Sequence, residues 1–455
     1  MPPSVILTIV QGSPSGRKYE FQERGTCLIG RSPDCNIPLP SGEAQATVSR
    51  HHCLLDVAPP KVRIRDFGSL NGTFVNGENI GSRAGGQAKG KEYDLKPGDT
   101  FRVGETVFEV SVTGEEGDDT VAQSCSRCGA SMQAGQGDLC AACRDNPLGL
   151  VEAILEQARQ GKAGFAGIEG YRVRKELGRG GMGAVYLAEN QATGGICALK
   201  VLLPQAAANK RAVQLFLREA ENSKILKHPN VVQVFETGFS GGTFFIAMEY
   251  CNDKSLRDLV ERSGGKVPVG EAVRLVLLAL EGLEYIHTVE LPRVKLADGS
   301  EVQAVGMVHR DLKPPNIFLH KEGDQRVAKI ADVGLSKAFD FAGLSGQTRT
   351  GQAAGSPMFM PRQQVIHFKY AKPEVDVWGM AATLYYLITG ASPREFTQGR
   401  DPWLTVLQTQ PTPILLRDPS VPERLAEVID TALVDYPKLT FTSAAQLRKA
   451  LEDAL

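Results

Sequence analysis

The sequence feature that most constrains this chain is the run MVHRDLKPPNIFL at residues 307–319. It places Asp311, Lys313 and Asn316 within six residues and has apolar residues at both ends. Apolar anchors on either side of a polar run predict a loop that the fold holds in place. Asp311 and Asn316 are five positions apart, so a carboxylate could accept a proton from a hydroxyl while an amide oxygen faces a metal ion. We therefore predict a catalytic loop here.

This run resembles the His-Arg-Asp catalytic loop of eukaryotic-type protein kinases of the kind found in bacteria. Its Asp-Leu-Lys-Pro form resembles the Ser/Thr class more than the tyrosine class. Upstream, LGRGGMGAV at residues 177–185 has the spacing Gly-x-Gly-x-x-Gly-x-Val. Alone, that run would also fit a dinucleotide-binding fold. A strand-like segment follows it where such a fold needs a helix, so we interpret it as a kinase-type glycine-rich loop.

The resemblance implies an enzyme that transfers the γ-phosphate of ATP to Ser or Thr hydroxyls of proteins, with Mg²⁺ or Mn²⁺ as cofactor. Asp311 would be the catalytic base or hydroxyl-orienting group, and Lys313 would stabilise the phosphoryl group in flight. Lys200, paired with Glu219, would hold the phosphates, while Asn316 and Asp332 would bind the metal. The implied nucleotide contacts are Leu177, Gly178, Gly180, Gly183, Val185, Ala198, Lys200, Met248, Glu249, Cys251 and Phe318.

Two apolar positions depart from the family pattern. Val333 replaces the Phe that usually follows the metal-binding Asp, and Ser223 lies where a large aliphatic residue normally packs against that Phe. Replacing buried bulk with small or polar groups typically costs a few kcal/mol. We therefore expect a looser active state. A competing hypothesis is a phosphopeptide-binding scaffold whose kinase domain binds nucleotide and transfers little phosphate.

The end of the activation segment also departs from the pattern. Pro361-Arg362-Gln363 replaces Ala-Pro-Glu, and Thr440 replaces the Arg that usually pairs with that Glu. Loss of one partner alone would strand a buried charge, whereas loss of both is tolerable, so we expect a different anchor. An insertion at residues 288–306 carries Asp298-Gly299 between alternating strands and predicts a β-hairpin of unknown role.

Residues 1–112 predict an all-β sandwich, because short alternating strands and turns follow each other with no helical stretch between them. Gly30-Arg31, the run SRHH at residues 49–52 and the run NGTFVNG at residues 71–77 resemble a forkhead-associated (FHA) domain, a module that binds phosphothreonine peptides. The resemblance implies that Arg31 and Ser49 hold the phosphate, that Arg50 flanks it, and that Asn71 grips the peptide main chain. His52 would be structural. The alternative is that the Asn-Gly pairs only make hairpins and Arg31 is a surface charge.

An acidic linker at residues 113–121 leads to two Cys-x-x-Cys pairs within residues 122–146, which predict a small zinc ribbon. The predicted ligands of a structural Zn²⁺ are Cys125, Cys128, Cys140 and Cys143. The alternative for such a motif is redox chemistry, which fits one pair better than two. Residues 147–170 predict a linker helix and a glycine-rich linker before the kinase-like segment at residues 171–455.

The whole chain is thus predicted to be multidomain: an FHA sandwich, a zinc ribbon and an α+β bilobal kinase fold. Its 455 residues carry a formal charge of −1 and no apolar run of membrane length. We expect a cytoplasmic protein that binds neither nucleic acid nor membranes. Expected partners are protein substrates and phosphothreonine proteins, or the chain's own phosphorylated segments at the candidate autophosphorylation sites Thr348, Thr350 and Thr120.

Overall fold

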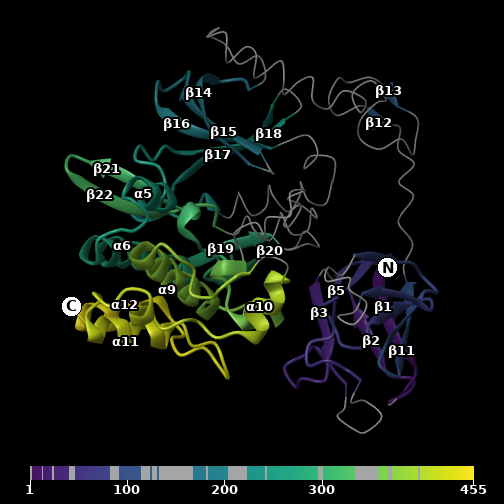
Figure 1. Cartoon of the computed structure of the whole chain (residues 1–455). Helices are drawn as coiled ribbons and strands as arrows, with labels where there is room; N and C mark the ends of the chain where they lie inside the picture. The colour runs from purple at the N-terminus through teal and green to yellow at the C-terminus, as the bar shows by residue number, and fades with distance from the viewer. Residues whose placement is uncertain are drawn as a thin grey trace.

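The structure is a computed structural model. It describes residues 3–12, 14–22, 25–39, 47–81, 92–113, 123–124, 131–132, 168–180, 183–202, 223–240, 243–295, 301–333, 357–366, 371–397 and 400–455. The described elements form an N-terminal β region, a short strand pair, and a C-terminal region with an upper sheet and a lower helical part (Figure 1). No helix in these ranges is both long and apolar enough to cross a bilayer.

Two sheets build the N-terminal region. The first has the order β2 (Lys18–Phe21), β1 (Ser4–Gln11), β11 (Thr106–Thr113), β10 (Thr100–Val103), β7 (Thr73–Val75), β8 (Glu78–Gly81). The second has the order β4 (Ile37–Pro38), β3 (Gly25–Gly30), β5 (Cys53–Ala58), β6 (Lys61–Asp66), β9 (Tyr93–Leu95). Alternate side chains of both sheets fill one buried core, as the period of two in a strand requires. The predicted β-sandwich is confirmed.

The predicted zinc-ribbon segment is described only at two short strands. β12 (Gln123–Ser124) pairs antiparallel with β13 (Ser131–Met132). The four cysteines, the acidic linker and the predicted helix after residue 147 lie outside the described residues. The zinc ribbon therefore stays a prediction.

A five-stranded antiparallel sheet forms the upper part of the C-terminal region. Its order is β14 (Tyr171–Gly180), β15 (Gly183–Asn190), β16 (Ile196–Leu202), β18 (Thr243–Glu249), β17 (Val234–Ser240). Tyr186, Leu199 and Ala247 are almost fully buried on one face of it. This small core fixes the positions of the strands that carry most of the predicted nucleotide contacts.

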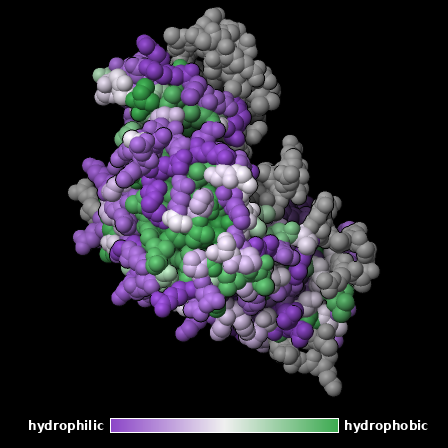
Figure 2. Space-filling view, turned by 60° about the vertical axis from the view of Figure 1, so that its left-hand side comes forward, coloured by the Kyte–Doolittle hydropathy of each residue, from purple (hydrophilic) through white to green (hydrophobic). Residues whose placement is uncertain are grey.

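The lower part is helical and holds the largest core. Its helices are α5 (Leu256–Arg262), α6 (Val269–Thr288), α8 (Arg362–Ile366), α9 (Glu374–Thr389), α10 (Pro402–Gln408), α11 (Glu423–Ala432) and α12 (Ala444–Asp453), with short 3-10 turns at η2 (Pro314–Asn316), η3 (Pro357–Phe359) and η5 (Ile414–Leu416). α9 is buried on nearly all sides, which is typical of a central core helix. Figure 2 shows apolar side chains gathered in the middle of one face and surrounded by hydrophilic ones.

Two hairpins complete the lower part. β21 (Ile317–Glu322) pairs with β22 (Gln325–Ile330), and β19 (Glu290–Lys295) pairs with β20 (Glu301–Val305). The second pair confirms the predicted hairpin insertion. It closes at Gly306, which has φ +72° and lies so close to the backbone oxygen of His287 that a Cβ would come within 2.1 Å of it.

Candidate functional site

The catalytic-loop run is held from below by the buried carboxylate of Asp376 on α9. The backbone amides of His309 and Arg310 each donate a 2.7 Å hydrogen bond to one of its oxygens. His287 of α6 contacts the same carboxylate at 2.9 Å. These bonds hold Arg310 at φ +67°, a left-handed conformation that non-glycine residues adopt rarely. The buried carboxylate therefore fixes the direction in which the next residue, Asp311, leaves the loop.

Three predicted catalytic and metal residues meet at Asp311. The Lys313 ammonium lies 2.8 Å from one carboxylate oxygen of Asp311. The Asn316 amide nitrogen donates to the Asp311 backbone oxygen at 2.8 Å and, at 3.0 Å, to the same carboxylate oxygen that Lys313 contacts. Both contacts with Asp311 are made by the amide nitrogen of Asn316, so its amide oxygen takes no part in them. The loop thus presents a carboxylate, an ammonium and an amide oxygen together.

Asp332 joins this cluster from the end of β22. Its carboxylate lies 2.7 Å from the Lys200 ammonium of β16, so a residue of the upper sheet and one of the lower part meet here. Asp332 has φ +59°, and the preceding Ala331 accepts a 2.8 Å hydrogen bond from the His309 ring. Burial acts to raise the pKa of Asp332, but Lys200, with His309 and Lys313, outweighs it and holds that pKa below its usual value. The carboxylate is therefore ionised at neutral pH.

The predicted partner of Lys200, Glu219, lies outside the described residues. The sequence did not indicate the contact between Lys200 and Asp332. Both residues were predicted to serve the phosphates and metal, and opposite charges brought to one site attract each other.

The strand register aligns the predicted nucleotide contacts across the upper sheet. Gly178 of β14 lies opposite Val185 of β15, and Val185 lies opposite Lys200 of β16. Ala198 of β16 lies opposite Met248 of β18. The remaining predicted contacts lie on or just after strands: Leu177 and Gly180 on β14, Gly183 on β15, Glu249 at the end of β18, Cys251 after it, and Phe318 on β21.

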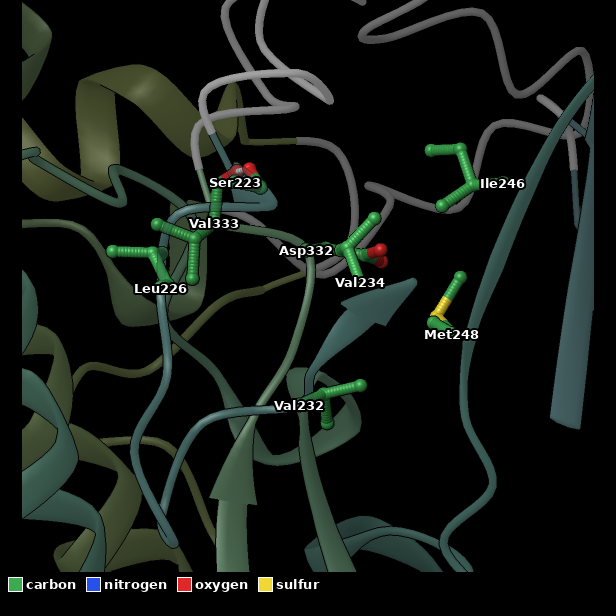
Figure 3. A pocket seen from close by; sticks show the side chains of 8 residues that line it. All are labelled: Ser223, Leu226, Val232, Val234, Ile246, Met248, Asp332 and Val333. Carbon is green, nitrogen blue, oxygen red and sulfur yellow. Dashed lines mark hydrogen bonds between the residues drawn. The ribbon is translucent and has the colours of Figure 1, made fainter. Parts of the chain in front are cut away.

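A small cavity is lined in part by Met248 (Figure 3). It offers about 20 Å³, room for about one water molecule. Its lining residues are Ser223, Leu226, Val232, Val234, Ile246, Met248, Asp332 and Val333. The two predicted departures meet at its edge, where the Ser223 hydroxyl donates a 3.0 Å hydrogen bond to the Val333 backbone oxygen. A hydrogen bond between Ser223 and Val333 thus replaces the apolar side-chain contact of the family pattern.

The activation-segment end has an anchor that the sequence did not reveal. The guanidinium of Arg394 and the carboxylate of Asp435 form a buried ion pair. Arg394 also donates to the Met360 backbone oxygen at 3.2 Å, and Asp435 accepts from the Arg362 amide at 2.7 Å. An Arg and an Asp at new positions therefore hold the segment in place of the missing Glu and Arg. No sequence signal linked residues 41 positions apart.

The N-terminal sandwich brings its predicted ligand residues to one group of loops. The Arg31 amide donates to the Ser49 backbone oxygen at 3.1 Å. The Ser49 hydroxyl accepts from the Leu70 amide at 3.2 Å, and the Asn71 side chain donates to the Thr47 oxygen at 2.7 Å. Arg31, Arg50 and Asn71 are exposed and Ser49 is partly so. Loops distant in sequence thus present two guanidinium groups, a hydroxyl and an amide at one end of the sandwich.

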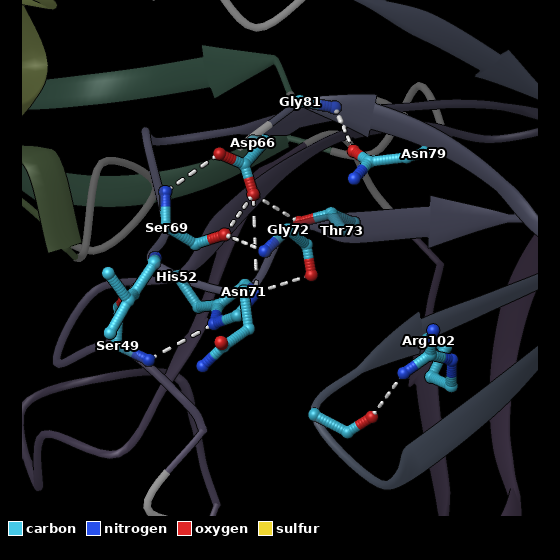
Figure 4. A network of polar contacts seen from close by, with 12 residues as sticks. Ser49, His52, Asp66, Ser69, Asn71, Gly72, Thr73, Asn79, Gly81 and Arg102 are labelled. Atoms are coloured by element: carbon cyan, nitrogen blue, oxygen red, sulfur yellow. Dashed lines mark hydrogen bonds and ion pairs between the residues drawn. The ribbon is translucent and has the colours of Figure 1, made fainter. Parts of the chain in front are cut away.

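A buried network holds these loops together (Figure 4). His52 accepts from the Ser49 amide at 3.1 Å and donates to the Gly72 oxygen at 3.1 Å. Burial lowers the pKa of His52, so the ring is neutral and can do both. Asp66 accepts 2.6 Å hydrogen bonds from the Ser69 and Thr73 hydroxyls. These contacts fit the structural role predicted for His52.

Comparison with known families decides what the larger region is. Residues 171–449 match the family model described as the protein kinase domain. The chain belongs to the protein kinase family. Residues 27–104 match the model described as the FHA domain. We therefore call the two regions the kinase domain, with its upper N-lobe and lower C-lobe, and the FHA domain.

Named bacterial kinases are among the relatives. The chain is 31% identical to the serine/threonine-protein kinase Pkn1 of Myxococcus xanthus, over 63% of this chain and 38% of that protein. It is 28% identical to the tyrosine-protein kinase MasK of the same species, over 63% of this chain and 43% of that protein. Among solved structures, the Mycobacterium tuberculosis PknI kinase domain matches with 26% identity and a TM-score of 0.46, over 63% of this chain and 97% of that one. The chain thus spans less than half the length of these two curated relatives.

Proposed function

We propose that the chain is a Ser/Thr protein kinase that transfers the γ-phosphate of ATP to protein hydroxyls. The observation that carries this proposal is the cluster of Asp311, Lys313 and Asn316 next to the Asp332–Lys200 ion pair. Asp311 accepts or orients the hydroxyl proton, and Lys313, whose ammonium lies 2.8 Å from the Asp311 carboxylate, stabilises the transferring phosphoryl group. Lys200 and the glycine-rich hairpin of β14 and β15 hold the other phosphates.

The donor set near Asp311 suits a hard divalent cation. Asp332 supplies an ionised carboxylate and Asn316 an amide oxygen, and Mg²⁺ or Mn²⁺ prefers oxygen ligands of both kinds. A bound Mg²⁺ would supply charge neutralisation for the phosphates. The chain's own part is to hold the two oxygen ligands on separate segments, the catalytic loop and the end of β22.

Phosphoryl transfer is tested by incubating the full chain with radiolabelled ATP and Mg²⁺ and following label on the chain itself. We expect incorporation by the native chain and a fall of at least about a hundredfold in Asp311→Asn, which keeps the shape but loses the base. Arg257→Gln, an exposed change on α5, is the control and should leave the rate unchanged. Acid hydrolysis should yield phosphoserine or phosphothreonine. Phosphotyrosine alone would contradict the Ser/Thr assignment.

A scaffold that binds nucleotide without transferring phosphate is the second candidate. The Ser223–Val333 bond and the cavity beside it favour this alternative, because they replace the apolar contact of the family pattern with a polar one. Nucleotide-dependent thermal stabilisation without any label incorporation would support the scaffold.

We infer that the FHA domain binds phosphothreonine through Arg31, Ser49, Arg50 and Asn71. Support comes from the converging loops, since a phosphate dianion is bound best by guanidinium groups together with short hydroxyl and amide donors. Arg31→Ala should lower affinity for a phosphothreonine peptide by at least about tenfold. Arg63→Ala is the control, because its partner is Asp94 on the neighbouring strand.

We also propose that Cys125, Cys128, Cys140 and Cys143 bind a structural Zn²⁺. The pairing of β12 with β13 supports this, because the two strands flank the first Cys-x-x-Cys pair. Metal analysis of protein purified without chelator should find about one zinc per chain. Cys125→Ser with Cys128→Ser should lose it, and a metal-free native chain would contradict the proposal.

A further inference from the structure

The outer face of one FHA sheet carries apolar side chains that the sandwich does not need. In β3, Cys27 and Ile29 point into the sandwich core, so Leu28 between them points outward. In β5, Cys53 and Leu55 do the same, and Leu54 points outward. An outward-facing Leu would be exposed on a free sandwich. Here Leu28 is fully buried and Leu54 is 8% exposed.

The C-lobe of the kinase domain covers this outer face. A cluster of buried side chains combines four from the FHA domain with four from α8 and α10: Leu28, Cys35, Leu54 and Phe67 with Val365, Ile366, Val406 and Leu407. Figure 1 shows the sandwich beside α10, with β3 on the side of the sandwich that faces α10. Two neighbouring apolar positions on adjacent strands thus meet two apolar positions on each of two helices.

Polar contacts fix the register of the two surfaces. The Asn36 side chain donates a 3.0 Å hydrogen bond to the Ile366 backbone oxygen at the end of α8. The Arg65 guanidinium lies 3.3 Å from one carboxylate oxygen of Asp401. The other oxygen of Asp401 caps α10 by accepting from the Trp403 amide at 2.8 Å. The contacts therefore bind the FHA domain to the C-terminal end of α8 and the N-terminal end of α10.

α8 connects this interface to the catalytic loop. Val365 and Ile366 face the FHA domain, and the adjacent Gln364, which is buried, donates a 2.6 Å hydrogen bond to the Arg310 backbone oxygen. Arg310 directly precedes Asp311. A helix of five residues cannot hold its own conformation in water and depends on what packs against it.

We propose that the outer FHA face, made of Leu28, Leu54, Phe67 and Arg65, is a docking surface for α8 and α10 of the same chain and that its docking positions the catalytic loop. This surface adjoins the loops that carry the proposed phosphopeptide ligands, because the Cys35 thiol of the interface cluster donates a 3.3 Å hydrogen bond to the Arg50 backbone oxygen. Docking gives the FHA domain a role in catalysis in addition to its proposed binding of phosphothreonine. Leu54 and Arg65 are positioning residues: Leu54 packs in the cluster that contains Val365 and Ile366 of α8, and Arg65 holds the docked position through Asp401 of α10.

The native cysteines provide a test of docking in the full chain. Cys35 is buried in the interface cluster, whereas Cys27 and Cys53 are buried in the sandwich core. Leu54→Asp with Arg65→Glu changes two cross-strand neighbours that face the C-lobe. In this variant we expect alkylation of Cys35 to quicken by at least about tenfold while Cys27 and Cys53 stay protected. Arg63→Glu, on the same strand but paired with Asp94, should leave all three rates unchanged.

If the double variant also exposes Cys27 and Cys53, the sandwich has unfolded, and Asp401→Asn then serves instead. Asn still caps α10 but loses the charge that Arg65 contacts. It should raise the Cys35 rate in the same direction by a smaller factor. Rapid alkylation of Cys35 in the native chain, or equal Cys35 rates in native chain and Asp401→Asn, would overturn the docking surface.

The positioning role is tested by hydrogen exchange and by rate. Undocking should speed amide exchange at residues 307–311 and 362–366 and lower kcat about two- to thirty-fold, the range expected for coupling through packed side chains. The KM for ATP should not change, because Lys200 lies on the N-lobe. Unchanged exchange at residues 307–311 in an undocked variant would overturn the positioning role. The rate measurement rests on the proposed kinase function, whereas alkylation and exchange remain decisive in an inactive chain.

Discussion

At the scale of single residues, the ion pair of Arg394 and Asp435 shows how a family contact can be replaced. Both side chains are almost completely buried. Burial lowers the pKa of Arg394, and Asp435 opposes that shift. The guanidinium also stacks over the Trp378 ring at 4.9 Å and donates to two backbone oxygens. A charge satisfied in this way is tolerable inside a protein, whereas the same charge without its partner is not.

We predict that Arg394→Leu destabilises the kinase domain by about 3–5 kcal/mol, because it leaves the Asp435 carboxylate buried without its counter-charge. Urea unfolding followed by tryptophan fluorescence measures the change, since Trp378 packs on Arg394. Arg257→Leu is the control. Its ion pair with Glu261 is exposed and should contribute less than about 0.5 kcal/mol. Equal midpoints for Arg394→Leu and the native chain would show that the buried pair is not the anchor.

At the scale of elements, the end of β3 controls the phosphopeptide loops. A Cβ on Gly30 would lie 2.1 Å from the Arg50 backbone oxygen. Arg31 follows Gly30 directly and Arg50 follows Ser49, so this close approach sets the distance between the two loops that we propose bind phosphate. Only glycine permits it.

We predict that Gly30→Ala lowers affinity for a phosphothreonine peptide by at least about tenfold, because the loops must separate to admit the methyl group. Fluorescence anisotropy with a labelled phosphopeptide measures it. Gly25→Ala is the matched control on the same strand, where a Cβ would meet nothing within 4 Å. Equal affinities for the two variants would contradict the argument.

Sequence patterns predicted the elements that depend on local rules. Strand alternation predicted the sandwich, and Asp298-Gly299 predicted the β19–β20 hairpin. The motif at residues 307–319 predicted which side chains would meet, and Asp311, Lys313 and Asn316 do. The Arg394–Asp435 pair and the contact of Leu54 with the C-lobe were not predicted, because each joins positions whose proximity only the complete fold creates. The outward position of Leu28 and Leu54 was the one available signal.

At the scale of the whole molecule, the FHA domain contacts α8, the helix that follows the C-terminal end of the activation segment. The loop that follows Arg31 contacts the C-lobe through Cys35 and Asn36. Asn36 binds the end of α8, and η3, which precedes α8, begins at Pro357. Thr350 lies seven residues before Pro357. Seven extended residues span at most about 25 Å, which limits how far Thr350 can lie from Pro357.

We predict that the chain phosphorylates itself on Thr348 or Thr350, with Thr120 as a further candidate, and that its own FHA domain then binds the mark. Tethering raises the effective concentration of such a site, so even a weak affinity suffices. Mass spectrometry of the active chain locates the phosphates, and timed phosphatase digestion measures their accessibility. Arg31→Ala should lose phosphate faster than the native chain because the guanidinium no longer covers it. Arg63→Ala, an exposed arginine of the same sandwich, should lose it at the native rate. The alternative is an FHA domain that recruits other proteins only, and it predicts equal removal rates for Arg31→Ala and the native chain.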